Sequence, residues 1–497
     1  MALRDASVIV IETARTVVRG GLGLHELLKT PSVIIQARVG LRKNASTFNE
    51  FQVNSGATEN GASSSRASSL PLIVQSNASV NDYLVGTQLD DALAAGQDIA
   101  ISWPFADGDV RDWTQAEAIW KYVLFNQLER RRAQNESPVL LSMYHGLSRD
   151  TYEKTCQVFF ERFNVAGLGI LERPMAQLYA TTNLSGVVVD IEYDKTDITP
   201  IYEGFIQRSA CDTIPLGIRD CHNYLIHILR SNQSLMKTLF PPDSEIPPTD
   251  AVVEDTLLAL VKQILDDGHI KVPSDGETAI PEDEGITDIA AIVVAGKEKA
   301  VIESGMKKKA NAKASAAEQA RAREIEALDL ITVQFRDKSV TLGKERHRLC
   351  EPLFDPTLLD GLNGSVTKQV PLQQAVGHAV READVDMRRY IWDGLLVTGD
   401  ITRNVKGIAI ALQSRLSPFI AQPELVSDLQ PRSIRILGLP EYYPEYRDTG
   451  EGFAAFLGSS IVAKLTFSDP HTKNFVSKAD YTHRGPRSII EMSPSLL

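Results

Sequence analysis

Few side chains in this sequence have the types and spacing needed for chemistry. His222 and His227 lie five residues apart in a segment with helical periodicity, so they do not share one helix face, and no acidic partner completes a metal site. We expect both to be surface or core-edge histidines. Ser142 and His145 are close in sequence, but their neighbours do not form a nucleophile elbow. Neither pair therefore supports an enzymatic reaction.

The bulk composition also narrows the classes of function. The chain has 497 residues, and its 52 basic and 64 acidic side chains give a net charge of −12, which disfavours direct nucleic-acid binding. Four cysteines without C-x-x-C spacing are typical of a reducing compartment, and we expect all four to be partly buried thiols. No uncharged apolar run approaches the ~18 residues that a membrane span needs. We expect a soluble, intracellular protein with two domains.

The apolar pattern predicts alternating strands and helices. Short β-branched runs predict strands at Val8–Ile11, Thr16–Arg19 and Ser32–Ile35, the first two forming a hairpin. Helical spacing predicts an amphipathic helix over Trp113–Leu128, with Thr114 as a possible N-cap. Further segments follow the same alternation: strands at 138–142 and 186–191, and helices at 149–163 and 252–265. Such an order favours an α/β architecture.

Two segments have compositions that cannot form a packed core. Residues 54–69 are almost entirely Ser, Asn, Gly, Ala and Thr, which predicts a flexible loop. Residues from about 270 to 328 combine acidic and basic runs with few large apolar side chains. We expect this second segment to be a mobile, charged insert.

Several sequence motifs resemble those of the actin family, in the family's order. The strongest is the C-terminal element Phe453–Leu465, followed by Phe475–Tyr481 and Gly485-Pro486. Others are found at 103–114, 118–120, 163–167, 178–180, 200–204, 343–348 and 354–356. The resemblance covers about three quarters of the chain. It implies an α/β actin-like fold, in which two duplicated RNase H-like domains, four subdomains in all, surround a central cleft.

The resemblance also implies domain boundaries. The first actin-like domain would comprise residues 1–36, 80–180 and 453–497, with residues 37–79 forming a loop-rich small subdomain. The second domain would comprise residues 181–452 and would carry the charged insert at about 270–328.

In actin relatives, two glycine-rich hairpins bind the nucleotide's phosphates, because glycine lets successive backbone N–H groups turn toward them. The first hairpin aligns with Glu12–Thr16, where Ala14 and Thr16 replace both glycines. The second aligns with Asp190–Asp194, where neither glycine is kept. Glu192 and Asp194 would instead place carboxylates near phosphate oxygens, an arrangement that is repulsive unless a metal intervenes.

Other cleft positions of the family are changed as well. Arg19 replaces the family's lysine, and it could either pair with Asp190 or Glu192 or make an altered phosphate contact. The family's water-orienting glutamine aligns with Arg173 and the histidine that assists it with Asp197, and these two could form a salt bridge.

The family's adenine-side loop aligns with residues 395–401. Here Gly399 stands alone, next to Asp400, and a lone glycine between strand and helix is commonly a turn. The corresponding cleft residues here are Glu12, Arg19, Asp190 and Gly399. Because the phosphate-binding glycines are replaced around them, we expect no cofactor, no favourable site for ATP and no hydrolysis.

A protein without catalysis can still bind partners, and actin-like folds take amphipathic helices in a groove between the two lower subdomains. By resemblance the walls of that groove are Tyr179, Thr181, Ile461, Val462 and Leu465. The alternative is that these residues only pack a domain interface.

The segment Leu439–Tyr446 and the acidic run at 282–292 resemble the ninth class of actin-related proteins, which are nuclear subunits of fungal SWI/SNF and RSC chromatin remodellers. That class implies a scaffold that pairs with a second actin-related protein on a helix of the ATPase subunit, together with a small accessory subunit. The alternatives are a nucleotide-binding, filament-forming actin relative and a subunit of an INO80-type nuclear complex.

Overall fold

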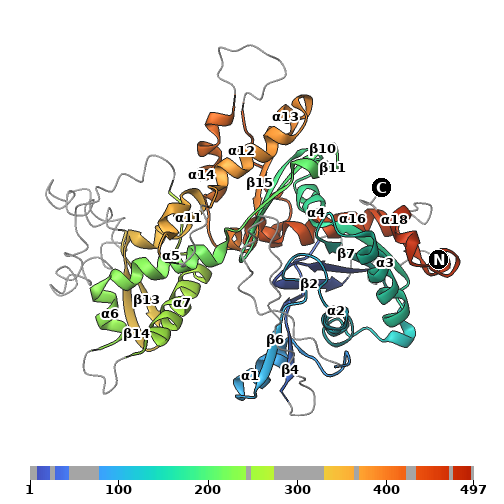
Figure 1. Cartoon of the computed structure of the whole chain (residues 1–497), viewed down its shortest axis with the longest axis horizontal. Coiled ribbons are helices and arrows are strands. Elements are labelled where there is room, and N and C mark those ends of the chain that lie inside the picture. The colour runs from blue at the N-terminus through green and yellow to red at the C-terminus, as the bar shows by residue number, and fades with distance from the viewer. Residues whose placement is uncertain are drawn as a thin grey trace, which may run out of the picture. The chain divides into compact units, whose positions relative to one another are not determined.

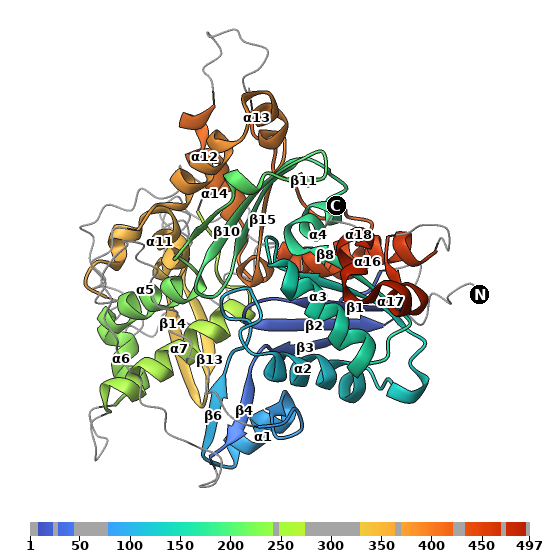
Figure 2. The ribbon, with the colours of Figure 1, turned by 45° about the vertical axis from the view of Figure 1, so that its right-hand side comes forward.

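The strand β1 (Ile9–Thr13) lies in the middle of a six-stranded sheet. In the computed structural model (Figure 1), β1 pairs antiparallel with β2 (Val17–Leu22), and β2 pairs with β3 (Val33–Gln36), which confirms the three predicted strands. The other edge of β1 pairs in parallel with β7 (Pro138–Met143), and β7 with β8 (Gly167–Glu172). A short β16 (Val476–Ser477) ends the sheet, whose first three strands lie side by side in Figure 2.

A second sheet repeats this arrangement. Its strand β9 (Gly186–Ile191) pairs antiparallel with β10 (Thr196–Tyr202) on one side and in parallel with β15 (Leu395–Thr398) on the other. The short strands β11 (Phe205–Ile206) and β12 (Asp212–Ile214) extend it. Each sheet thus combines an antiparallel hairpin with a parallel strand, and the α/β class predicted from the sequence is confirmed.

The structure describes residues 8–22, 28–43, 78–241, 248–273, 329–362, 369–420, 433–468 and 474–493. The predicted flexible loop at 54–69 lies outside them, and so do residues 274–328 of the predicted insert. Within the described ranges, no helix is long and apolar enough to cross a membrane.

The first predicted helices form as expected but end in wider turns. Helix α2 (Trp113–Lys121) continues as π-helical turns over Tyr122–Gln127, and α3 (Arg149–Gln157) does so over Val158–Arg162. The suggested N-cap Thr114 is wrong. The cap of α2 is Asp112, whose carboxylate accepts hydrogen bonds from the backbone N–H groups of Thr114 at 2.9 Å and Gln115 at 3.0 Å. An aspartate in extended conformation just before the helix satisfies two donors that would otherwise lack partners.

Apolar clusters cover both faces of β1. Ile9 and Ile11 pack in a cluster with Trp120 and Phe159, whereas Val8 and Val10 pack in a second cluster that includes α4 (Arg173–Ala180) and α16 (Ala454–Ser468). Successive side chains of a strand point to opposite faces, so a strand covered on both faces must be continuously apolar. The second cluster also contains Val188 of β9 and Leu396 of β15, and α4 contacts strands of both sheets.

Helices α4 and α16 pack so closely that the backbone of one contacts the backbone of the other. A Cβ atom built on Gly458 of α16 would lie 1.7 Å from the carbonyl oxygen of Ala176 in α4. Such a distance is far inside van der Waals contact, so only glycine fits at this crossing. The C-terminal sequence element is therefore fixed against the first helix that follows β8.

The chain divides into two compact units. Unit 1 comprises residues 1–215, 376–403 and 420–497, and unit 2 comprises residues 216–375 and 404–419. The units cut the chain at other places than the predicted domain boundaries, because α4 and β9, on either side of residue 180, pack together in unit 1. The predicted boundaries themselves stay a prediction.

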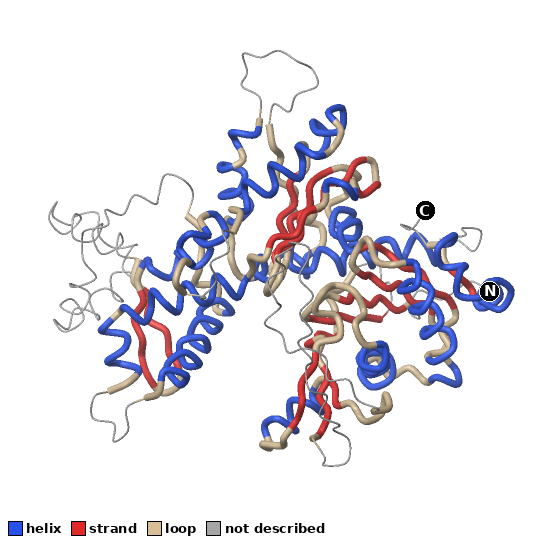
Figure 3. The backbone as a smooth tube through the Cα atoms, viewed as in Figure 1, coloured by secondary structure: helices blue, strands red, loops and turns tan. Residues whose placement is uncertain are grey.

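The remaining elements follow the same division. Unit 2 contains the hairpin of β13 (Ile331–Phe335) and β14 (Lys338–Leu342), seen in Figure 3 as paired red strands next to blue helices. Its helices include α6 (Gln233–Leu239) and α7 (Asp250–Asp266), which contact the hairpin, and α5 (Ile218–Ser231), α11 (Glu351–Phe354) and α14 (Ile408–Arg415). Unit 1 also contains a third sheet, of β5 (Leu84–Val85), β4 (Val39–Arg42) and β6 (Ile99–Ser102). Its further helices are α1 (Thr87–Ala94), α13 (Val385–Trp392), α15 (Pro444–Arg447), α17 (Lys478–Arg484) and α18 (Ser488–Met492). Helix α12 (Leu372–Glu382) has residues in both units.

The contact between α4 and α16 yields a test in which two effects have opposite signs. Replacing Gly458 by Ala should raise helix propensity by about 1 kcal/mol. We expect the clash with Ala176 to outweigh that gain and to lower the free energy of unfolding by about 3 kcal/mol. Urea unfolding followed by tryptophan fluorescence measures this, because all four tryptophans lie in unit 1.

Gly438→Ala is the matched control, since its added Cβ would lie 3.5 Å from the nearest Glu451 oxygen, an ordinary contact. Its free energy of unfolding should change by no more than about 0.5 kcal/mol. A Gly458→Ala protein at least as stable as the wild type would show that the two helices are not in backbone contact.

Candidate functional site

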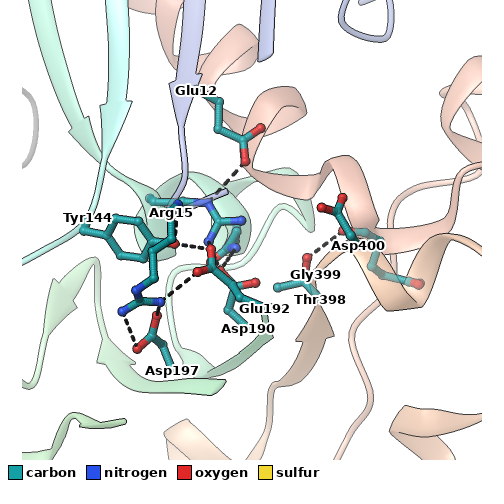
Figure 4. Close-up of polar contacts among 12 residues, drawn as sticks. Glu12, Arg15, Tyr144, Asp190, Glu192, Asp197, Thr398, Gly399 and Asp400 are labelled. Carbon is teal, nitrogen blue, oxygen red and sulfur yellow. Dashed lines mark hydrogen bonds and ion pairs between the residues drawn. The ribbon is translucent and has the colours of Figure 1, made fainter. Parts of the chain in front are cut away.

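Charged side chains converge at one end of the two sheets of unit 1. Glu12 and Arg19 are directly opposite each other on β1 and β2, and Asp190 and Asp197 are directly opposite each other on β9 and β10. Glu12 follows Val8 and Val10 on the same face of β1, and Asp190 follows Val188 on the same face of β9, so each carboxylate continues an apolar row of the cluster around α4. The charges are therefore the polar end of that core (Figure 4).

Arg15, in the turn between β1 and β2, reaches across to the second sheet. Its Nη1 lies 2.5 Å from Asp197 Oδ2 and 2.8 Å from Glu192 Oε2, and its Nη2 donates to Asp197 Oδ1 at 3.1 Å. The guanidinium also stacks on Tyr144, with its carbon 4.3 Å from the ring centre, and Tyr144 donates a hydrogen bond to Glu192. Figure 4 shows Arg15 pointing toward Asp197 and Glu192.

Arg173, the first residue of α4, links both sheets. It donates to Glu12 Oε1 at 3.2 Å, to Glu192 Oε1 at 2.9 Å and to Asp190. The side chain is 5% exposed, so this contact set replaces hydration almost completely. Gln177, one turn further along α4, donates to Asp190 Oδ2 at 2.7 Å.

Two pairings expected from the sequence are corrected by the structure. Arg19 pairs with Glu12, at 2.7 Å, and with Asp400, instead of with Asp190 or Glu192. Arg173 and Asp197 do not pair with each other, because the turn between β1 and β2 places Arg15 against Asp197. Asp194 lies half-buried in the turn between β9 and β10.

Gly399 has a packing role at the end of β15. Its φ of +113° is a conformation that other residues rarely adopt, and a Cβ there would lie 2.1 Å from the carbonyl oxygen of Ile191. This agrees with the interpretation of Gly399 as a turn. The glycine brings the next residue, Asp400, to Arg19.

A cavity of about 260 Å³ lies beside the cluster. Its walls include Arg15, Arg173, Asp190, Asp197 and His145. The remaining lining residues are Asp107, Gly108, Asp109, Tyr144, Gly146, Leu147, Pro174, Thr199 and Thr213. Acidic side chains outnumber arginines in this lining, so the cavity does not favour an anionic ligand.

Burial and neighbouring charges change the protonation of this cluster. Burial raises the pKa of Asp190 to about 7, against the opposing effect of Arg173. Burial alone would raise the pKa of Asp197 as well, but Arg15 holds that pKa below its ordinary value. Burial lowers the pKa of His145 and raises that of Tyr144 far above its ordinary value.

The other predicted candidates carry no site. His222 is buried on α5 without a hydrogen-bond partner, whereas His227 on the same helix is exposed, so the two lie on different faces. Burial lowers the pKa of His222 to about 4, which keeps it neutral. All four cysteines are free thiols, and three of them are fully buried. Among the described residues, no group of His, Cys, Asp or Glu is arranged to hold a metal ion.

The predicted partner-binding residues lie on neighbouring elements. Tyr179 is half-buried on α4, and Thr181, the C-cap residue of that helix, is buried. On α16, Ile461 and Val462 are half-buried and Leu465 is 69% exposed. Sequence analysis missed two exposed apolar neighbours, Leu184 and Phe205. Phe205 follows Gly204 in the chain, and the backbone N–H of Gly204 donates to the carbonyl of Leu184. A Cβ added to Gly204 would lie 3.4 Å from the Tyr179 hydroxyl, so both residues lie near Tyr179. The sequence offered one signal for Phe205, an apolar residue directly after a glycine.

Comparison with known proteins agrees with this fold. The family model described as Actin matches residues 3–493. The chain is 26% identical to the SWI/SNF and RSC complexes subunit arp9 of Schizosaccharomyces pombe, over 98% of this chain and 99% of that protein. It is 24% identical to actin-related protein 2 of the same yeast, over 84% of this chain and 88% of that protein.

The buried cluster predicts a large cost for removing its central arginine. Arg173→Met keeps most of the side-chain volume but leaves three buried carboxylates short of a partner. We expect the free energy of unfolding to fall by about 3–5 kcal/mol in urea titrations.

Arg484→Met is the control. Arg484 lies 3.1 Å from Glu491 in an ion pair whose members are 56% and 66% exposed. Its loss should change the free energy of unfolding by less than about 1 kcal/mol. Similar losses for both variants would contradict a central role for Arg173.

Proposed function

The chain belongs to the actin family, and from that premise we propose that it is a non-catalytic scaffold subunit of a nuclear chromatin-remodelling complex of the SWI/SNF or RSC type. The similarity to the arp9 subunit over nearly the whole of both chains supports this assignment. In this proposal the protein contributes binding surfaces and holds no nucleotide.

The observation that carries the non-catalytic part is the pairing of Arg15, Arg19 and Arg173 with the chain's own carboxylates. At the strand ends where the family binds phosphates, each of these arginines already has at least two partners on the protein. A phosphate group would have to displace carboxylates that lie in the same buried cluster, and like charges in a poorly solvated site repel strongly.

The hairpin backbones support the same conclusion. The N–H of Ala14 donates to the carbonyl of Val17 at 2.9 Å, and the N–H of Glu192 donates to the carbonyl of Lys195 at 2.9 Å. The N–H of Arg15 faces the Tyr144 hydroxyl at 3.4 Å. These three N–H groups already have acceptors in the protein, whereas a phosphate site needs several N–H groups turned toward the ligand.

We predict that the purified protein hydrolyses ATP no faster than buffer. Neither hairpin offers glycine donors, and the positions that align with the family's water-orienting pair are Arg173 and Asp197, both held in ion pairs. Phosphate release measured beside a hydrolysing actin-family protein tests this. Turnover above background that an Asp190→Ala variant abolished would overturn the non-catalytic assignment and favour a nucleotide-binding actin relative.

The proposed partner surface is formed by apolar side chains of α4 and α16, of the chain between α4 and β9, and of β11. Leu465, Phe205 and Leu184 are its most exposed members, and Tyr179, Ile461 and Val462 connect them to the core. We infer that this surface takes an HSA-type helix of the remodeller's ATPase subunit. A second actin-related protein would bind the same helix, with a small accessory subunit.

Leu465→Asp should weaken binding of that helix at least tenfold without changing the melting temperature. The side chain is exposed, so a charge there costs nothing in the free protein, but it loses its hydration in the complex. Titration of a synthetic helix peptide, with the paired actin-related protein present, measures the Kd.

Two variants complete this experiment. Ile410→Asp, on α14 of unit 2, replaces an apolar side chain that is 53% exposed and should leave the Kd unchanged. Val462→Asp should weaken binding too, but Val462 also packs against the core, so its melting temperature separates the two effects. Equal Kd values for the wild type and Leu465→Asp would place the helix elsewhere.

The complex itself is tested by copurification from nuclear extract followed by identification of the subunits. Recovery with SWI/SNF or RSC subunits supports the proposal, and recovery with INO80-type subunits would assign the protein to the other nuclear complex.

A further inference from the structure

Carboxylates outnumber arginines in the buried cluster of unit 1. The five carboxylates and the three arginines that pair with them are Glu12, Asp190, Glu192, Asp197 and Asp400 against Arg15, Arg19 and Arg173. Only Asp400, with 37% of its side chain exposed, has substantial contact with water. Full ionisation would therefore leave excess negative charge in a site that is otherwise nearly dry, which is costly.

The excess is greatest around Asp190. Its Oδ2 accepts hydrogen bonds from Arg173 and Gln177, but its Oδ1 has no hydrogen-bond partner among the described residues. Asp197 lies directly opposite on β10, and Glu192 follows two residues later in the chain, just past the end of β9. A buried carboxylate oxygen without a donor, next to two like charges, strongly disfavours ionisation.

Several elements around Asp190 contribute charged or titratable groups. Toward it face Arg173 of α4 and Glu12 of β1, with Arg15 of the following turn and Arg19 of β2 further away. The chain after β7 brings Tyr144 and His145, and β15 contributes the uncharged Thr398 as the register partner of Asp190. Lys195 lies 3.8 Å from Asp107, so its charge is directed to that carboxylate. The arginines are already shared among the other carboxylates.

The cavity gives Asp190 a route for proton exchange. Asp190 is one of its lining residues, and about 260 Å³ is ample for several water molecules, each of which occupies about 30 Å³ in the liquid. A proton can thus reach the carboxyl group without the cluster having to unfold.

We propose that Asp190 binds a proton at neutral pH, and that this proton balances the buried charge cluster and stabilises unit 1. Neutralising one carboxyl leaves its hydrogen bond from Gln177 in place and removes its repulsion with Asp197 and Glu192. The raised pKa of Asp190, about 7, agrees with this arrangement.

The sign of the pH dependence follows from linkage. The unfolded chain releases the proton near pH 4 and the folded chain near pH 7, so the folded state binds more protons between these values. The stability that Asp190 contributes is full below about pH 4 and is lost as the pH rises to about 7. His145 acts in the opposite direction, because its lowered pKa favours the folded state as the pH rises. A difference between variants is therefore needed to isolate Asp190.

Asp190→Asn, which mimics the protonated carboxyl group, supplies that difference. Urea unfolding of the wild type and the variant at pH 5, 6, 7 and 8 gives their folding equilibrium constants. We expect the ratio of variant to wild type to rise by up to about tenfold per pH unit between pH 5 and 7, and then to level off. A ratio that is constant, or that falls with pH, would overturn the proposal.

Asp197→Asn is the matched control, because it removes the opposite carboxylate of the same cluster. Since Arg15 keeps the pKa of Asp197 low, Asp197 itself does not titrate in this range, so the ratio of its variant to the wild type should change less steeply with pH than that of Asp190→Asn. The same pH slope in both variants would also count against a proton specific to Asp190.

A measurement on the wild type covers the case that Asp190→Asn does not fold. In protein labelled with ¹³C-aspartate, infrared spectra should show a protonated carboxyl band at pH 6 that disappears with a midpoint near pH 7. Exposed aspartates are already ionised at pH 6, with pKa values near 4. A spectrum without that band would overturn the proposal.

Discussion

The requirement that buried charges be neutralised where they lie governs the centre of unit 1. Arg15, Arg19 and Arg173 lose almost all their hydration, and each gains carboxylate partners from a different strand or turn. An arginine fork fixes distance and direction at the same time, so these pairs also set how the ends of the two sheets face each other. Without these ion pairs, few contacts would join the two sheets at the charged end of the apolar core around α4.

Helix α4 transmits this constraint to the rest of the unit. Its first turn contributes Arg173 to the cluster, its middle contacts α16 through Ala176, and its last turn carries Tyr179 toward the exposed apolar side chains. One short helix therefore joins the charged cluster, the closest backbone contact of the core and the surface that we propose for partner binding. A displacement of α4 would disturb all three.

Local sequence signals predicted the elements well and the pairings poorly. The β-branched run at 8–11 and the apolar spacing after Trp113 each report a local preference, and both elements form. The resemblance to actin placed Glu12, Arg19, Asp190 and Gly399 in one region, and the structure brings them there. Which arginine meets which carboxylate depends on the turn after Thr13, which points Arg15 at Asp197. The capping role of Asp112 and the exposure of Phe205 likewise depend on the backbone conformation at these residues, which residue types alone do not determine.

Covalently tethered counter-ions differ from a bound ligand in their response to the surroundings. A site stabilised by a ligand gains free energy that grows with the logarithm of that ligand's concentration, and it weakens when the supply falls. The carboxylates around Arg15, Arg19 and Arg173 are part of the chain, so their local concentration is fixed by the fold. In a protein that holds no nucleotide, as we propose, the charged cluster of unit 1 would therefore keep its arrangement whatever the nucleotide supply.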